Sequence, residues 1–156
     1  MLPITKICCP TDFSEPSQEA LKVACEVATH FSAELILVHV VTPIPVIPIH
    51  DDPTSFNLPL YEKEMEQSAL KALRKMQQEK VSPSIRSRTV VIQGDPSSQI
   101  VGLADSENMD MIIIATHGFT GWRKFMFGSV TEKVIRYANC PVLSIRVPPQ
   151  QEKNPL

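Results

Sequence analysis

The stretch MIIIATHGFTGWRK, Met111 to Lys124, and the pair Gly128-Ser129 that follows it decide the fold of this chain. The first five residues form a short continuous apolar run, which is typical of a strand buried on both faces of a parallel sheet. The glycines after it allow left-handed or closely approached backbone. We expect a helix to begin at Gly128-Ser129, with Ser129 and Glu132 as a capping box. Because free amides and the positive dipole end of a helix attract anions, this order of elements predicts a phosphate site.

Apolar segments of two kinds alternate along the whole chain. Short runs rich in valine and isoleucine predict five strands, at Thr5–Pro10, Glu34–Val41, Ile85–Ile92, Asp110–Ala115 and Val142–Val147. Apolar residues that recur every three or four positions predict four helices between them. Their apolar stripes hold Ala20, Leu21, Ala24, Val27, Ala28 and Phe31; Met65, Ala69, Leu73 and Met76; Ile100, Val101 and Ala104; and Val130, Val134, Ile135 and Ala138.

Local signals mark the ends of these helices. Ser14 is the expected N-cap of the first helix, with Pro16 in its first turn, and Asp95-Pro96 begins the third. Asn139 and Pro141 end the fourth. Five strands alternating with four helices predict an α/β fold, an open doubly wound parallel sheet with helices on both faces and right-handed crossovers.

Length and charge narrow the class of protein. A chain of 156 residues is sufficient for one domain with its own core, which we place at residues 1–148. Within it, residues 42–60 are rich in proline and predict a surface loop, either a variable connection or a flap over a ligand; residues 149–156 predict a flexible tail. A net charge of -2 and a pI near 6.1 argue against a general nucleic-acid binder.

No apolar run approaches the length of a membrane span, and residues 1–6 lack the pattern of a signal peptide, so we expect a cytoplasmic protein without membrane contact. Cys8 and Cys9 are neighbours on a predicted strand, so their side chains point to opposite faces and cannot share a metal ion. None of the four cysteines has C-x-x-C spacing. We predict that all four are structural and that there is no metal site.

The glycine loop resembles a known nucleotide motif. Ala115-x2-Gly118-x9-Gly128-Ser129 is similar to the G-x2-G-x9-G-[S/T] motif of the universal stress proteins of the ATP-binding type, with Ala115 at the family's first glycine. The segments 129–135, 140–143, 9–14 and 37–40 also match the family, so the resemblance covers nearly the whole chain. It implies the strand order 3-2-1-4-5, which periodicity alone leaves open. The switch point, where open sheets of this class bind ligands, would then lie between the first and fourth strands.

The resemblance implies an adenine-nucleotide site at that switch point, holding ATP, AMP or ADP with Mg²⁺ carried by the nucleotide. Asp12 would accept hydrogen bonds from ribose hydroxyls, although an acid at a helix N-terminus is a plainer interpretation. The backbone of Val40 would receive the adenine edge, and its plainer interpretation is a core valine. The full implied set is Pro10, Thr11, Asp12, Val40, Ala115, Thr116, His117, Gly118, Arg123, Gly128, Ser129 and Val130.

No catalytic residue is predicted. His117 has no acidic partner evident in sequence, and the chain lacks a G-x-x-x-x-G-K-[S/T] loop, a G-x-G-x-x-G turn, H-E-x-x-H and G-x-S-x-G. We therefore expect a small regulatory or stress-response module with little or no ATPase activity. One alternative is a nucleotide-independent interaction module, a dimerising scaffold, which Ala115 favours. A phosphotransfer or nucleotidyl-transfer enzyme is disfavoured because its signatures are missing.

The last predicted strand indicates self-association. Residues 142–147 should lie at an edge of the sheet, where unpaired backbone groups invite another strand. Most of its residues are apolar, namely Val142, Leu143, Ile145 and Val147. An uncovered edge of this kind would tend to associate with another strand. Universal stress proteins commonly dimerise through this strand, and the resemblance implies a homodimer here.

Overall fold

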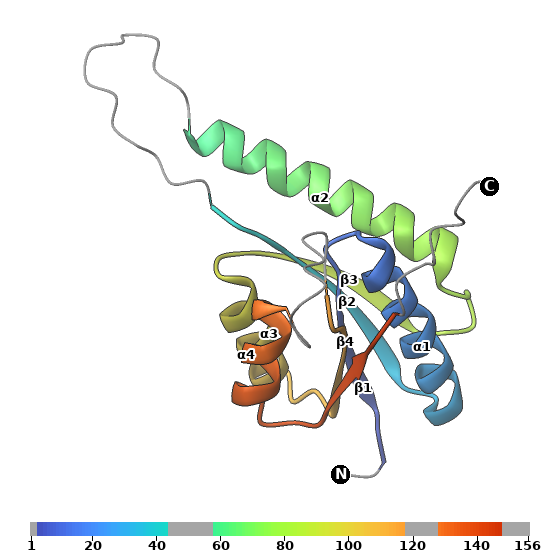
Figure 1. Ribbon diagram of the computed structural model, residues 1–156. Coiled ribbons are helices and arrows are strands. Elements are labelled where there is room, and N and C mark those ends of the chain that lie inside the picture. The colour runs from blue at the N-terminus through green and yellow to red at the C-terminus, as the bar shows by residue number, and fades with distance from the viewer. Residues whose placement is uncertain (1–2, 44–57, 118–127, 148–156) are drawn as a thin grey trace, which may run out of the picture.

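The computed structural model describes residues 3–43, 58–117 and 128–147, which form one parallel sheet with helices on both faces (Figure 1). The strands in these residues are β1 (Lys6–Pro10), β2 (Glu34–Val41), β3 (Ser87–Gln93), β4 (Met111–Ala115) and β5 (Val142–Ile145). The helices are α1 (Glu15–Phe31), α2 (Leu58–Lys80), α3 (Pro96–Ser106) and α4 (Ser129–Tyr137). The sheet order is β3-β2-β1-β4-β5 with every pair parallel, so the predicted fold class and strand order are confirmed.

Successive side chains of each strand point to opposite faces of the sheet, so the core has two layers. On one face Ile7, Cys9, Leu35, Leu37 and Ile113 pack against α1 and α2. On the other face Cys8, Ile36, Val38, Ile112 and Ile114 pack against α3 and α4. Figure 1 shows the two helix pairs on opposite sides of the strands. The predicted separation of Cys8 and Cys9 onto opposite faces is confirmed, and burial raises the pKa of the Cys8 thiol to about 12.

The helix ends were predicted well in two cases and wrongly in one. The Ser14 side chain accepts a hydrogen bond from the Ser17 N–H, and Asp95 accepts one from the Ser98 N–H, so both expected N-caps are confirmed. Ser129 is not an N-cap. Gly128 occupies that position in α4 and no side chain caps the helix, so the predicted capping box with Glu132 is wrong.

Three members of the predicted apolar stripes lie outside the core. Phe31 ends α1 and Ile135 lies on the outer side of α4, and both are more than a third exposed. Met65 is 41% exposed because α2 begins at Leu58 and its first half extends beyond the sheet (Figure 1). α2 thus begins within residues 42–60, which were predicted to form a loop. Proline at position 59 is compatible with the helix because it lies in the first helical turn. Residues 44–57 of that loop and the 149–156 tail lie outside the described residues.

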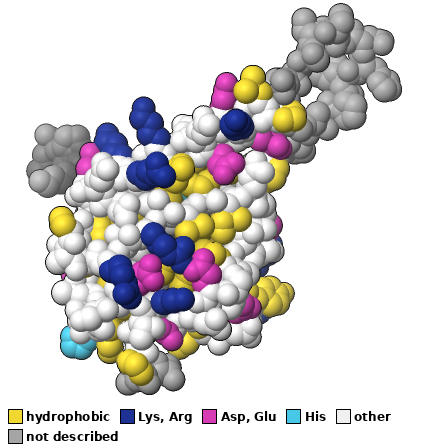
Figure 2. Space-filling model, turned by 180° about the vertical axis from the view of Figure 1, so that it is seen from behind, with side chains coloured by type: hydrophobic (Ala, Val, Ile, Leu, Met, Phe, Trp, Pro, Cys, Tyr) yellow, Lys and Arg dark blue, Asp and Glu magenta, His cyan; other side chains and the backbone are white. Residues whose placement is uncertain are grey.

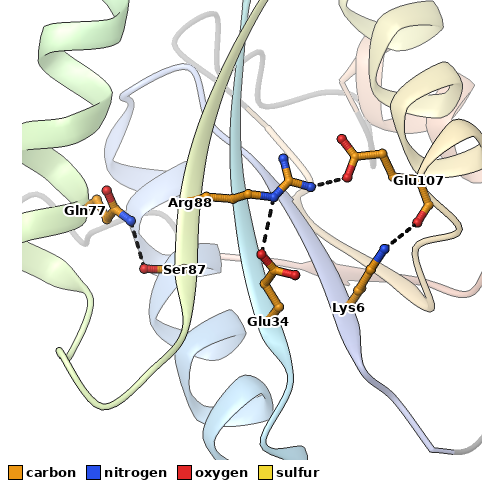
Figure 3. Close-up of polar contacts among 6 residues, drawn as sticks. All are labelled: Lys6, Glu34, Gln77, Ser87, Arg88 and Glu107. Atoms are coloured by element: carbon orange, nitrogen blue, oxygen red, sulfur yellow. Dashed lines mark hydrogen bonds and ion pairs between the residues drawn. The ribbon is translucent and has the colours of Figure 1, made fainter.

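A network of polar side chains lies at the end of the sheet where the strands begin (Figure 3). Arg88 of β3 makes ion pairs with Glu34, at the start of β2, and with Glu107, which follows α3. Lys6 of β1 donates to the Glu107 carbonyl oxygen at 3.0 Å. On the molecular face in Figure 2, Lys and Arg side chains lie intermixed with Asp and Glu side chains. None of the helices in the described residues is both long and apolar enough to cross a membrane.

Candidate functional site

A cavity of about 250 Å³ opens at the carboxyl ends of β1, β2 and β4. It lies at the switch point of the sheet, because β1 pairs with β2 on one side and with β4 on the other. The starts of three helices surround it. Its walls are formed by Pro10, Thr11, Asp12, Ser17, Val38, His39, Val40, Pro96, Ile100, Ile114, Ala115, His117, Gly128, Ser129, Val130 and Thr131.

The turn after β1 brings Asp12 to the cavity. The Thr11 N–H donates to the Val38 carbonyl oxygen at 2.8 Å, which extends the pairing of β1 and β2 past the last strand residue. One Asp12 carboxylate oxygen, Oδ1, accepts hydrogen bonds from the Ser14 N–H and the Ser14 hydroxyl. The carboxylate thus has a defined position at the start of α1. Both proposed roles of Asp12, ligand acceptor and helix N-terminal acid, are compatible with this place.

On the opposite wall, the chain after β4 meets the start of α4. The Gly128 N–H donates to the Thr116 carbonyl oxygen at 2.7 Å, and the Thr131 hydroxyl donates to the Ala115 carbonyl oxygen at the same distance. These bonds tie the first turn of α4 to the end of β4. The N–H groups of Ser129, Val130 and Thr131 have no partner within the described residues, so α4 presents an anion-attracting end beside the cavity.

The third part of the wall is apolar. Val38 and Val40 of β2 and Ile114 of β4 line the cavity on the α3 and α4 side of the sheet. Pro96 and Ile100, from the first two turns of α3, complete this wall. A cavity with an apolar wall next to a carboxylate and a helix N-terminus suits a ligand with an apolar part, hydroxyl groups and an anionic end.

The N-terminal end of α3 is set by a strong cap. The Asp95 carboxylate accepts hydrogen bonds from the Ser97 hydroxyl at 2.6 Å and from the Ser98 N–H and hydroxyl. The bond from the Ser97 side chain, followed by those from Ser98, lowers the pKa of Asp95 to about 2. The cap fixes the turn that carries Pro96 into the cavity wall.

Most of the sequence-predicted site residues line this cavity. Those that do are Pro10, Thr11, Asp12, Val40, Ala115, His117, Gly128, Ser129 and Val130. Thr116 is buried outside the wall; its hydroxyl pairs with His117 Nδ1 at 2.9 Å and its carbonyl accepts from Gly128. Gly118 and Arg123 lie outside the described residues.

Sequence reasoning missed the contributions of α3 and of the inward strand positions. Pro96 and Ile100 were predicted only as parts of a helix, and the other lining residues outside the predicted site set are Ser17, Val38, His39, Ile114 and Thr131. A signal was available for Pro96, because Asp95-Pro96 begins a helix at the carboxyl end of a strand, where ligands bind. Within the described residues, no group of three or more His, Cys, Asp and Glu side chains is arranged to hold a metal ion.

Comparison with known proteins gives the class to which this fold and cavity belong. The model of the Universal stress protein family matches residues 3–146, so the chain belongs to that family. It is 35% identical over 146 residues to universal stress protein MJ0531 of Methanocaldococcus jannaschii, covering 94% of this chain and 84% of the relative. Universal stress protein MJ0577 of the same organism is 31% identical, with 90% and 94% covered.

Solved structures support the same assignment. That of MJ0577 superposes with a TM-score of 0.78 at 29% identity, covering 92% of this chain and 96% of that one. UspA of Lactobacillus plantarum gives a TM-score of 0.77 at 26% identity, with 91% and 97% covered. More distant members, which share the fold, include a universal stress protein in complex with cAMP and one from Archaeoglobus fulgidus in complex with dAMP, with TM-scores of 0.63 and 0.55.

Proposed function

We propose that this universal stress protein binds an adenine nucleotide in the switch-point cavity and acts as a regulatory stress-response module with little or no ATPase activity. The observation that carries the proposal is the meeting of three features around one cavity: Asp12 after β1, Val40 on β2 and the start of α4. These features match in order a ribose, a base and a phosphate chain. The complexes of distant relatives with cAMP and dAMP support an adenine ligand.

ATP with Mg²⁺ is the particular ligand we propose, since α4 presents its positive end to an anion and a nucleotide can carry its own metal ion. His117 lines the described part of the cavity, and we assign it no role as a general base. Binding of the nucleotide alone does not accelerate its hydrolysis, so we expect little or no ATPase activity. The cytoplasmic location expected from the sequence stays a prediction.

Nucleotide retained by the protein tests this function directly. The protein is purified without added nucleotide and denatured, and the released small molecules are separated by chromatography. We expect adenine nucleotide in the supernatant. Protein that contains none, and that binds no ATP, AMP or ADP in calorimetry, would instead favour the nucleotide-independent interaction module.

Base selectivity tests the role of β2. Calorimetry with Mg²⁺ should give micromolar affinity for ATP and poorer affinity for GTP, because a backbone edge at Val40 discriminates between the hydrogen-bonding patterns of the two bases. Equal affinity for both would contradict the adenine assignment. Labelled ATP incubated with the protein should be converted slowly or not at all; rapid turnover would show an enzyme.

Self-association through β5 is also part of the proposal. β5 is the last strand in the sheet order, and its Leu143 side chain is 38% exposed. An apolar, unpaired strand edge is stabilised by pairing with another strand. We therefore propose a homodimer in which β5 of one chain pairs with β5 of another about a two-fold axis.

A further inference from the structure

The turn beside Asp12 contains a strained residue. Phe13 has a φ of 68°, in the left-handed region that bulky side chains rarely adopt. Ser32 and Asn108 also have positive φ angles, but they follow α1 and α3, where helix ends often take this conformation. Phe13 precedes a helix and lies next to a cavity residue. Such strain persists only where the surrounding structure holds it.

Contacts from three directions hold Phe13. Its N–H donates to the Thr11 hydroxyl oxygen at 3.0 Å, and its carbonyl accepts from the Gln18 side-chain amide at 3.2 Å. Its ring lies against the imidazole of His39, with 4.5 Å between the ring centroids and 37° between the planes. The imidazole comes from β2, so a neighbouring strand supports the turn from outside it.

His39 also holds the turn by a hydrogen bond. Its Nδ1 lies 2.8 Å from the Thr11 carbonyl oxygen. Because a carbonyl oxygen only accepts, Nδ1 must carry the proton and donate it. The same imidazole therefore contacts the residue before Asp12 by this bond and the residue after it by ring packing.

His39 borders the cavity, but its ring lies on the other side of β2 from the valines of the cavity wall. Leu37 belongs to the core layer under α1 and α2, whereas Val38 and Val40 belong to the layer under α3 and α4. By strand alternation the His39 ring lies on the Leu37 side, where Phe13 also packs. β2 thus lines the cavity with Val38, His39 and Val40, and its histidine also supports the β1–α1 turn.

We propose that His39 is a positioning residue: its Nδ1–H and its ring hold the strained turn at Phe13 in the conformation that presents the Asp12 carboxylate to the cavity. The consequence for binding rests on the proposed function, in which Asp12 accepts hydrogen bonds from ribose hydroxyls. The conformation of the turn itself does not depend on any nucleotide.

The first test uses nuclear magnetic resonance of the nucleotide-free protein. At about pH 8, where imidazoles are normally neutral, the ring nitrogen shifts of His39 should show the proton on Nδ1. In His39→Leu, which removes donor and ring, the Phe13 amide should lose its protection from hydrogen exchange. His39→Asn, whose side-chain N–H₂ can replace Nδ1–H, should retain most of it. A proton on Nε2 with Nδ1 bare, or unchanged Phe13 protection in His39→Leu, would overturn the proposal.

The second test measures the preference for ribose hydroxyls. Calorimetry compares ATP with 2′,3′-dideoxy-ATP, which lacks both hydroxyls, in the parent, His39→Leu, His39→Asn and Asp12→Ala. We expect His39→Leu to lose about tenfold of the preference for ATP, the size of one hydrogen bond. Asp12→Ala should lose this preference to a similar extent. The double variant, with both His39→Leu and Asp12→Ala, should lose no more than either single variant, and His39→Asn should keep the preference.

The outcomes separate the two proposals. A parent protein that binds neither nucleotide overturns the proposed function, while the tautomer and the exchange measurements still decide whether His39 holds the turn. A parent that prefers ATP, together with a His39→Leu variant of undiminished preference, overturns the positioning role. Thermal unfolding of each variant checks that the fold persists, and the tautomer measurement requires no variant.

Discussion

Gly128 shows at the scale of one residue what a glycine in this loop provides. Its φ is -70°, an angle that any residue adopts, so the sequence-based expectation of left-handed backbone does not apply here. A Cβ atom at this position would lie 3.4 Å from the Thr116 carbonyl oxygen and 3.9 Å from His117 Cα, which is ordinary contact. Neither the backbone angle nor the neighbouring atoms thus require a glycine here. We expect its role to lie in the space in front of α4, where we propose that phosphate lies.

The first prediction concerns this space. Gly128→Val should lower ATP affinity at least tenfold, because its branched side chain would occupy the approach to the α4 amides, while thermal unfolding stays cooperative. Gly102→Val is the matched control, since Gly102 lies on α3 with nothing within 4 Å of an added Cβ. The two variants are compared by calorimetry. Parent-like affinity in Gly128→Val would mean that phosphate does not approach α4 at this residue.

The second prediction uses Gly102 itself. Gly102→Ala should raise the free energy of unfolding by about 0.5–1 kcal/mol, because alanine restricts the unfolded chain and favours a helix interior. ATP affinity should not change, since residue 102 is outside the cavity wall. Urea denaturation and calorimetry measure the two quantities. A loss of stability would indicate that other atoms pack more closely against residue 102 of α3 than the structure shows.

At the scale of one element, the cap of α3 links helix formation to pH. The pKa of Asp95 in the folded protein, about 2, is below its ordinary value of 3.8, mainly because the Ser97 and Ser98 side chains and the Ser98 amide bond its carboxylate. A depressed pKa stabilises the fold above the ordinary value, and this contribution is lost as the pH falls from about 4 to about 2.

The third prediction follows from that sign. Asp95→Asn should lower stability at neutral pH and give a shallower fall in melting temperature between about pH 4 and pH 2 than the parent shows. Part of the fall should remain, because hydrogen bonds from Thr5 and Lys6 also lower the pKa of Asp110. Melting curves at several acidic pH values measure the slope. Identical slopes in parent and variant would exclude Asp95 as a source of acid sensitivity.

The fourth prediction concerns the network in Figure 3, which connects β1, β2 and β3 with the residue that follows α3, at the end of the sheet opposite the cavity. Arg88→Met should lower the free energy of unfolding by about 1 kcal/mol, the upper range for partly exposed pairs, because it removes the ion pairs to Glu34 and Glu107. Lys75→Met is the control. Lys75 pairs with Glu79 at 3.8 Å with both side chains more than half exposed, so its loss should have little effect. ATP affinity should be unchanged in both variants.

At the scale of the whole molecule, the fifth prediction tests the homodimer. Ser144→Pro should weaken dimerisation, because the carbonyl groups of Pro141 and Ile145 bond β4, so by alternation the Ser144 N–H faces the free edge of β5 and proline removes that donor. Light scattering should give twice the chain mass of 17.4 kDa for the parent and a lower mass for the variant at micromolar concentration. A parent with the mass of one chain throughout that range would refute the dimer. Circular dichroism checks that the variant remains folded.

Much of this architecture follows from local sequence. The order of strands and helices came from apolar periodicity, and the caps at Ser14 and Asp95 came from side chains that bond amides three residues away. Such interactions span a few residues, so the chain specifies them wherever it lies in space. The strand order was obtained from the family resemblance and not from periodicity, which describes each element without its neighbours.

The tertiary structure decided which residues meet. Asp12 and Gly128 line one cavity only because β1 pairs with β4, and Pro96 joins them only because α3 packs on that face of the sheet. Gly128 and not Ser129 caps α4, because the Gly128 N–H bonds the Thr116 carbonyl at the end of a strand twelve residues earlier. The bond from His39 to Thr11 joins neighbouring strands in the same way. Contacts between distant segments depend on the packed sheet, and no local pattern in the sequence records them.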